Sequence, residues 1–134
     1  MSDDYKVELK LEGDPAMLGV AARLFMELGE VPNGPGEDEI ERLAAVVEPV
    51  LAALLGSLSQ LPGPPILDLM MGCDAREVTV ELSVASAGKQ GRDLLGKKAG
   101  RLVAAVKKVF DKVEGPEAPA GGAFRFNFTR TISA

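Results

Sequence analysis

Residues 66–86, ILDLMMGCDAREVTVELSVAS, contain two apolar-rich runs separated by the short segment GCDA. Within the second run, the side chains alternate strictly in character along the chain. The apolar positions are Val78, Val80, Leu82 and Val84, and the polar positions between them are Glu77, Thr79, Glu81 and Ser83. A period of two is typical of a strand with one buried face, and the intervening turn predicts a β-hairpin.

The only cysteine of the chain, Cys73, falls in this predicted turn, with Arg76 close by. An exposed turn and a neighbouring arginine favour a reactive thiol. The chain has no histidine to serve as a base for that thiol, so we interpret Cys73 as a residue without a catalytic role. A single cysteine also excludes an internal disulfide and suits a reducing compartment.

A strand and two helical regions are expected before the hairpin. In residues 4–13, DYKVELKLEG, apolar and charged side chains alternate, which predicts another half-buried strand. Asp14 followed by Pro15 predicts the start of a helix that should end near Gly29. The segment that follows, residues 30–39, is rich in proline and glycine and is expected to be a loop.

The second helical region, about 37–61, has an apolar stripe wider than one contact with a small sheet requires. Pro49 predicts a kink in it, or a division into two shorter helices. The surplus apolar width and the open edges of a small sheet favour association between copies of the chain. The residues expected at that interface are Leu51, Leu54, Leu55 and Leu58.

Residues 85–100, ASAGKQGRDLLGKKAG, lead from the hairpin into a basic helix expected over about 91–114. A strand, a glycine turn with a lysine and a helix follow one another in phosphate-binding loops. The nucleotide-binding consensus is incomplete, because Gln90 follows Lys89 where a magnesium-binding hydroxyl is needed. The segment is therefore either a tight turn into a packing helix or a site for an anion. The residues of that anion site are Gly88, Lys89, Gly91 and Arg92.

Gly96 and Gly100 form a G-x-x-x-G pattern in the same helix. Glycine in a helix interior costs roughly 1 kcal/mol relative to alanine, so two of them indicate a packing or binding reason. We expect another backbone to approach closely at Gly96 and Gly100, and we include both in the expected interface.

The last strand is expected in residues 123–133, AFRFNFTRTIS, whose alternating phenylalanines predict a buried face. Counting the two N-terminal helices as one enlarged crossover gives the ferredoxin-like order β-α(α)-β-β-α-β. The sequence therefore predicts one α+β domain over residues 1–134. Its architecture is a two-layer sandwich, with helices on one face of a four-stranded antiparallel sheet.

Composition restricts the chemistry. The chain has 134 residues, a net charge of −5 and no histidine, which removes Ser-His-Asp and Cys-His mechanisms and histidine-based metal sites. We expect no catalytic residue, no cofactor and no metal site, although carboxylate or lysine chemistry stays open. No apolar run reaches the roughly 18 residues of a membrane span, and the start of the chain is acidic. A cytoplasmic protein without a membrane segment is expected.

Charge is distributed unevenly along the chain. Residues 1–60 carry twelve acidic and four basic side chains, whereas residues 89–112 carry eight basic and two acidic ones. We expect a small, non-catalytic binding and assembly module that forms homo-oligomers or binds a charged protein partner. One alternative is a protein or enzyme that binds an anionic small ligand, a nucleotide or phosphorylated metabolite, through residues 85–100. Nucleic-acid binding through the basic helix is a second alternative, disfavoured by the net charge and by an open sheet face without aromatic residues.

Overall fold

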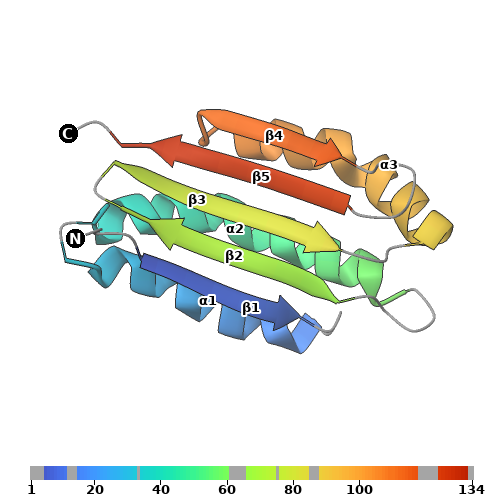
Figure 1. Ribbon diagram of the computed structural model, residues 1–134, viewed down its shortest axis with the longest axis horizontal. Helices are drawn as coiled ribbons and strands as arrows, with labels where there is room; N and C mark the ends of the chain where they lie inside the picture. The colour runs from blue at the N-terminus through green and yellow to red at the C-terminus, as the bar shows by residue number, and fades with distance from the viewer. Residues whose placement is uncertain are drawn as a thin grey trace.

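The computed structural model describes residues 5–11, 15–32, 34–60, 66–74, 76–84, 88–117 and 124–132, and within them five strands form one sheet with three α-helices on one face (Figure 1). The strands are β1 (Tyr5–Leu11), β2 (Leu67–Cys73), β3 (Glu77–Val84), β4 (Lys112–Glu117) and β5 (Phe124–Thr131). The helices are α1 (Leu18–Glu27), α2 (Glu37–Leu58) and α3 (Gly88–Lys107), and single 3-10 turns flank α1 at Pro15–Met17 and Leu28–Glu30. The predicted α+β class is confirmed.

The strand order is β1-β2-β3-β5-β4, and every neighbouring pair is antiparallel. The sheet thus has five strands rather than the predicted four, and the ferredoxin-like order is not confirmed. One crossover helix returns the chain so that the next strand runs parallel to the first. Two helices lie between β1 and β2, and the additional reversal makes β2 antiparallel to β1. One split β-α-β unit is present, because β3 and β4 both pair with β5 between them.

The fifth strand arises where the sequence predicted the end of the basic helix. Helix α3 ends at Lys107, and the N–H groups of Val109 and Phe110 both donate to the carbonyl of Val106, at 3.1 and 2.8 Å. From Lys112 the chain pairs with β5 instead. The apolar spacing in this region fits a helix, but it equally fits a turn followed by a short strand. The predicted helix 91–114 is therefore wrong over its last seven residues.

Helix α2 is one continuous helix of 22 residues, so Pro49 does not divide it. Pro49 and Ala45, whose carbonyl loses its intrahelical partner, both lie on the exposed side. Water can hydrogen-bond the carbonyl there, which lowers the cost of the proline. The predicted first helix is also present, and its last turn contains Gly29.

The core lies between the sheet and the helices, with α2 packed against both α1 and α3. The apolar positions predicted for β3 are all buried, and so are Phe126 and Phe128 of β5. Cys73 is the last residue of β2 and is buried, so it does not lie in an exposed hairpin turn. No helix among the described residues is long and apolar enough to cross a membrane.

One charged side chain, Arg130, lies on the helix-covered side of β5. Its guanidinium forms ion pairs with Glu39 of α2 at 3.0 Å and with Asp111 at 3.1 Å, and only 28% of its side chain is exposed. The hydrogen bond to Glu39 is the main cause that raises the pKa of Arg130 above its ordinary value. Arg130 therefore joins the start of α2 to the turn between α3 and β4.

Candidate functional site

The four leucines expected at an interface are in the core of the chain. Leu51, Leu54, Leu55 and Leu58 are each 0% exposed. Helix α2 lies against the sheet and between two other helices, so a wide apolar surface is buried within one copy of the chain. This packing accounts for the apolar surplus without a second molecule, and an interaction surface has to be sought elsewhere.

The two glycines of the G-x-x-x-G pattern lie in α3. The surroundings of Gly96 are outside the described part of the structure. Gly100 is exposed, and a Cβ atom built on it meets no described atom within 4 Å. The described residues of the chain therefore place no backbone against Gly100.

We predict that Gly100→Ala raises the free energy of unfolding by about 0.5–1 kcal/mol, because alanine is the better helix former and its methyl group has space. Gly29→Ala is the matched control. Its Cβ would lie 2.9 Å from the Cα of Glu37, so this variant should be destabilised. Urea unfolding of both variants measures the difference. A loss of stability in Gly100→Ala would show that another backbone does approach this position.

The expected anion site does not form a loop from residue 88 onward. Gly88, Lys89, Gly91 and Arg92 belong to the first turns of α3. The side chains of Lys89 and Arg92 lie outside the described part of the structure, as do residues 85–87. The anion site thus stays a prediction from the sequence.

The basic surface of α3 is exposed where the structure describes it. Lys97, Arg101 and Lys107 are all exposed on this helix. The open face of the sheet carries charged and polar side chains, as the sequence predicted, and no aromatic ring of the described residues points from it. Phe126 and Phe128 are buried on the opposite face, where their ring centroids are 5.2 Å apart.

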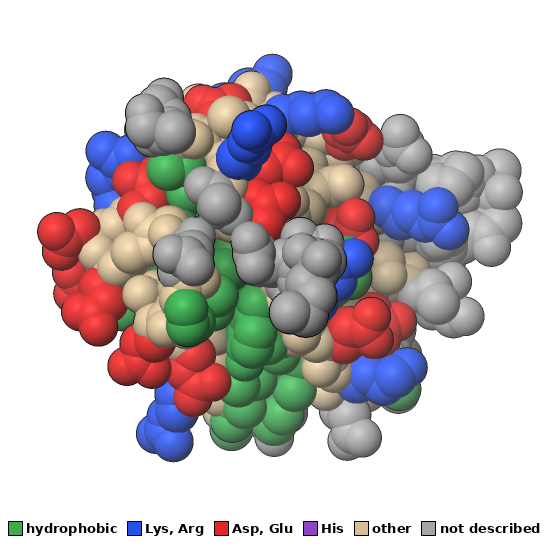
Figure 2. Space-filling view, turned by 60° about the vertical axis from the view of Figure 1, so that its left-hand side comes forward, with side chains coloured by type: hydrophobic (Ala, Val, Ile, Leu, Met, Phe, Trp, Pro, Cys, Tyr) green, Lys and Arg blue, Asp and Glu red, His purple; other side chains and the backbone are tan. Residues whose placement is uncertain are grey.

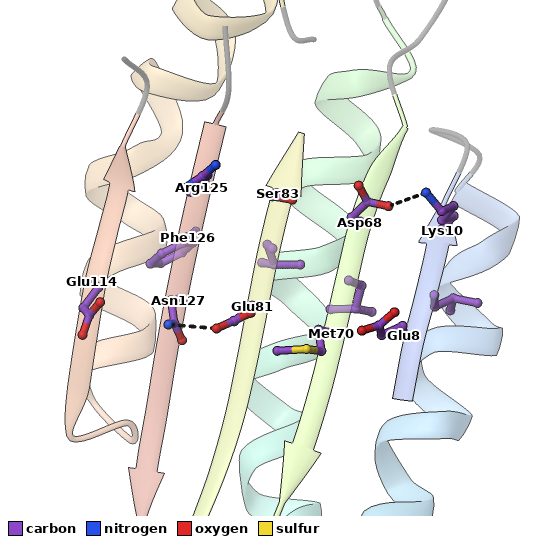
Figure 3. Close-up of a pocket in the computed structure, with 13 residues that line it drawn as sticks. Glu8, Lys10, Asp68, Met70, Glu81, Ser83, Glu114, Arg125, Phe126 and Asn127 are labelled. Carbon is purple, nitrogen blue, oxygen red and sulfur yellow. Dashed lines mark hydrogen bonds and ion pairs between the residues drawn. The ribbon is translucent and has the colours of Figure 1, made fainter. Parts of the chain in front are cut away.

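The open face contains a polar hollow of about 910 Å³ that spans all five strands (Figure 3). Two polar contacts hold its floor: Lys10 with Asp68 at 3.4 Å, and the side-chain amide of Asn127, which donates to Glu81 at 3.3 Å. The Asn127 Oδ1 atom is buried and accepts no hydrogen bond from the described residues. The sequence alone does not reveal this hollow, because it depends on which strands are neighbours.

The carboxylates of this hollow are spread out rather than paired. Glu8, Glu81 and Glu114 lie in one cross-strand row, with Met70 and Asn127 between them. Their backbones are two strands apart, which is about 10 Å at the usual strand spacing. Among the described residues, no three potential metal ligands of the His, Cys, Asp or Glu type come together. The row is an acidic stripe on a sheet, without a close carboxylate pair.

The β1 edge, defined as Tyr5–Leu11 on the side away from β2, is a surface whose backbone groups are not paired by another described strand. The strand stands at one end of the sheet order. The carbonyl oxygen of Tyr5 lies on the β2 side, 3.1 Å from the position that a Cβ of Gly72 would occupy. Because successive residues of a strand direct their N–H and C=O groups to opposite sides, those of Lys6, Glu8 and Lys10 point outward. No strand in the described part of the chain pairs with these groups.

Strand β1 and helix α1 carry partly exposed apolar side chains. Tyr5 is 39% exposed, Val7 and Leu9 are half-buried, and Val20 of α1 is 44% exposed. Figures 1 and 3 both place α1 behind β1, on the helix-covered side of the sheet. Figure 2 shows hydrophobic side chains reaching the surface on its lower side, where Figure 1 places β1 and α1.

The opposite edge of the sheet, β4, has features that oppose pairing. Its register with β5 is irregular between Glu114 and Glu117, and Gly115 has a φ of 87°. Irregularities, glycine, proline and charge are the usual protection of edge strands. The β1 edge is by contrast seven residues long and regular in its pairing with β2.

A scan of protein-family models and a search of curated protein sequences found no match to this chain.

Proposed function

We propose that this protein is a small, non-catalytic binding module that self-associates, and that two copies join through the β1 edge. The observation that carries this proposal is the row of outward-pointing backbone groups on a regular strand at the end of the sheet. Unpaired N–H and C=O groups of this kind are a template for another strand.

Two further observations support self-association. Lys6 and Glu8, which have opposite charges, are neighbours along the same face of the strand and form no ion pair within the described part of the chain. The other face of β1 and the adjoining α1 leave Tyr5 and Val20 partly exposed. Joining two copies would pair the backbone groups and bury part of the Tyr5 side chain.

We predict that the wild-type chain is a dimer by light scattering at tens of micromolar, and that Glu8→Pro is a monomer. Proline removes the outward N–H of residue 8, which β2 does not use. The fold of the variant should persist, because prolines are tolerated on edge strands when the N–H faces solvent. Circular dichroism and thermal unfolding check that it does.

Glu8→Ala is the control, because it removes the same carboxylate and keeps the N–H group. It should remain largely dimeric, since an exposed ion pair contributes only about 0.2–1 kcal/mol. A monomeric wild type would overturn self-association. A folded and dimeric Glu8→Pro would show that the copies join through another surface.

A further inference from the structure

We propose a specific arrangement of the two copies: their β1 strands pair antiparallel about a two-fold axis that passes through Val7. This inference rests on the proposed self-association and specifies its geometry. The backbone groups of Lys6, Glu8 and Lys10 point outward from the β1 edge. In an antiparallel pair, outward-pointing residues of one strand must stand opposite outward-pointing residues of the other.

This requirement leaves only alignments in which even-numbered residues of β1 face even-numbered residues. The charges of the residues that face each other then distinguish between these alignments. A two-fold axis at Lys6, Glu8 or Lys10 places like charges opposite one another, either a residue with its own copy or Lys6 with Lys10. An axis at Val7 places Lys6 opposite Glu8 of the second copy, and an axis at Leu9 places Glu8 opposite Lys10. Only the last two alignments pair opposite charges directly across the strands.

The local contacts favour the axis at Val7. Lys10 already forms an ion pair with Asp68 at 3.4 Å, so an axis at Leu9 would make Glu8 compete with Asp68 for it. An axis at Val7 instead uses Lys6 and Glu8, which form no ion pair within the described residues. It also places Tyr5 opposite Leu9 and covers the most exposed apolar side chain of the strand.

The resulting assembly is a continuous ten-stranded sheet, twice the five strands of one copy. A two-fold axis normal to the sheet keeps both helical layers on one side and both polar hollows on the other. The two α1 helices, which lie behind β1 in each copy, then lie on the same side of the joined sheet. Val7 faces Val7 of the second copy in a non-hydrogen-bonded pair, where Cα atoms are about 4.5 Å apart.

Disulfide cross-linking tests this arrangement, because a separation of about 4.5 Å lies within the range that a disulfide spans. Val7→Cys and Leu9→Cys are each made in a Cys73→Ala background, and the dimers are treated with a mild oxidant. The expected result is a covalent dimer from Val7→Cys and little from Leu9→Cys. Cross-linking mainly at Leu9→Cys, equally at both, or at neither while the dimer persists would overturn the axis at Val7. A monomeric parent chain would instead overturn the proposed function.

Charge exchange gives a second test that does not depend on a cysteine. Glu8→Lys places lysine opposite Lys6 of the second copy, and its dimer should dissociate about tenfold or more readily at low salt. The double variant Glu8→Lys/Lys6→Glu restores opposite charges only for an axis at Val7, so it should recover the dimer. Glu8→Lys/Lys10→Glu restores them only for an axis at Leu9. Recovery in the second double variant alone would overturn the proposal.

Discussion

Phe128→Ala should lower the free energy of unfolding by about 3–5 kcal/mol, the largest loss we predict for a single substitution. The side chain is 1% exposed, so its removal leaves a cavity that no solvent fills readily. Its ring also meets Phe110 edge-on, with centroids 4.6 Å apart and planes at 76°. Phe110 lies in the turn between α3 and β4, where its N–H donates to the carbonyl of Val106. The substitution therefore weakens the packing of that turn as well as that of β5.

Phe128→Leu is the control for this prediction. It keeps most of the apolar volume and loses the aromatic contact, so its cost should be about 1 kcal/mol. Urea unfolding should be compared at one chain concentration, because association of the chains contributes to the measured stability. A loss below that of the leucine variant in Phe128→Ala would contradict the observed core.

Most of the strand pattern could be predicted from the sequence because one face of the sheet is covered and the other is open. A half-buried strand must alternate. In β3 every second side chain is buried, and apolar and polar residues alternate in sequence over Tyr5–Leu11 of β1 and over residues 124–129 of β5. The buried phenylalanines of β5 were predicted on this basis and are confirmed for Phe126 and Phe128. Arg130 lies an even number of residues from these phenylalanines and therefore on the same face of the strand. A charged residue at a position expected in the core indicates, from the sequence alone, that it forms ion pairs there.

The strand order could not be predicted in the same way. The connection from β1 to β2 contains two helices, and each reversal of the chain changes the direction of the next strand. Strand β4 was missed because Val109, Phe110 and Val113 continue the helical spacing of α3. Hydrogen bonds to the carbonyl of Val106 end the helix at this point, and pairing with β5 then makes the following residues a strand instead of a further helical turn.

The candidate site shows the same division between local and global information. Alternation in β1 was visible from Tyr5 to Leu11, but only the strand order places β1 at an edge. The leucines of α2 were expected at an interface, because a stripe of apolar residues does not reveal whether its partner is another helix or another molecule. Here α1, α3 and the sheet cover them.

Arg130→Ala should lower the free energy of unfolding by about 2–3 kcal/mol, because hydrogen bonds to charged groups contribute about 1.5–3 kcal/mol and Arg130 forms more than one. The substitution leaves Glu39, 20% exposed in its side chain, without its partner from β5. The backbone N–H of Thr131 still donates to Asp111 at 2.6 Å, so the end of β5 keeps one anchor.

Arg125→Ala is the matched control, because Arg125 lies on the same strand, is exposed and faces the open side. Its effect should stay within about 0.5 kcal/mol, as is usual for surface positions. Since folding raises the pKa of Arg130, its stabilising contribution is fully present at every pH below the ordinary arginine value and is lost only in stronger alkali. The difference between the two variants should therefore not change as pH rises from neutral to moderately alkaline. Equal losses in the two variants would show that Arg130 does not connect α2 to the turn before β4.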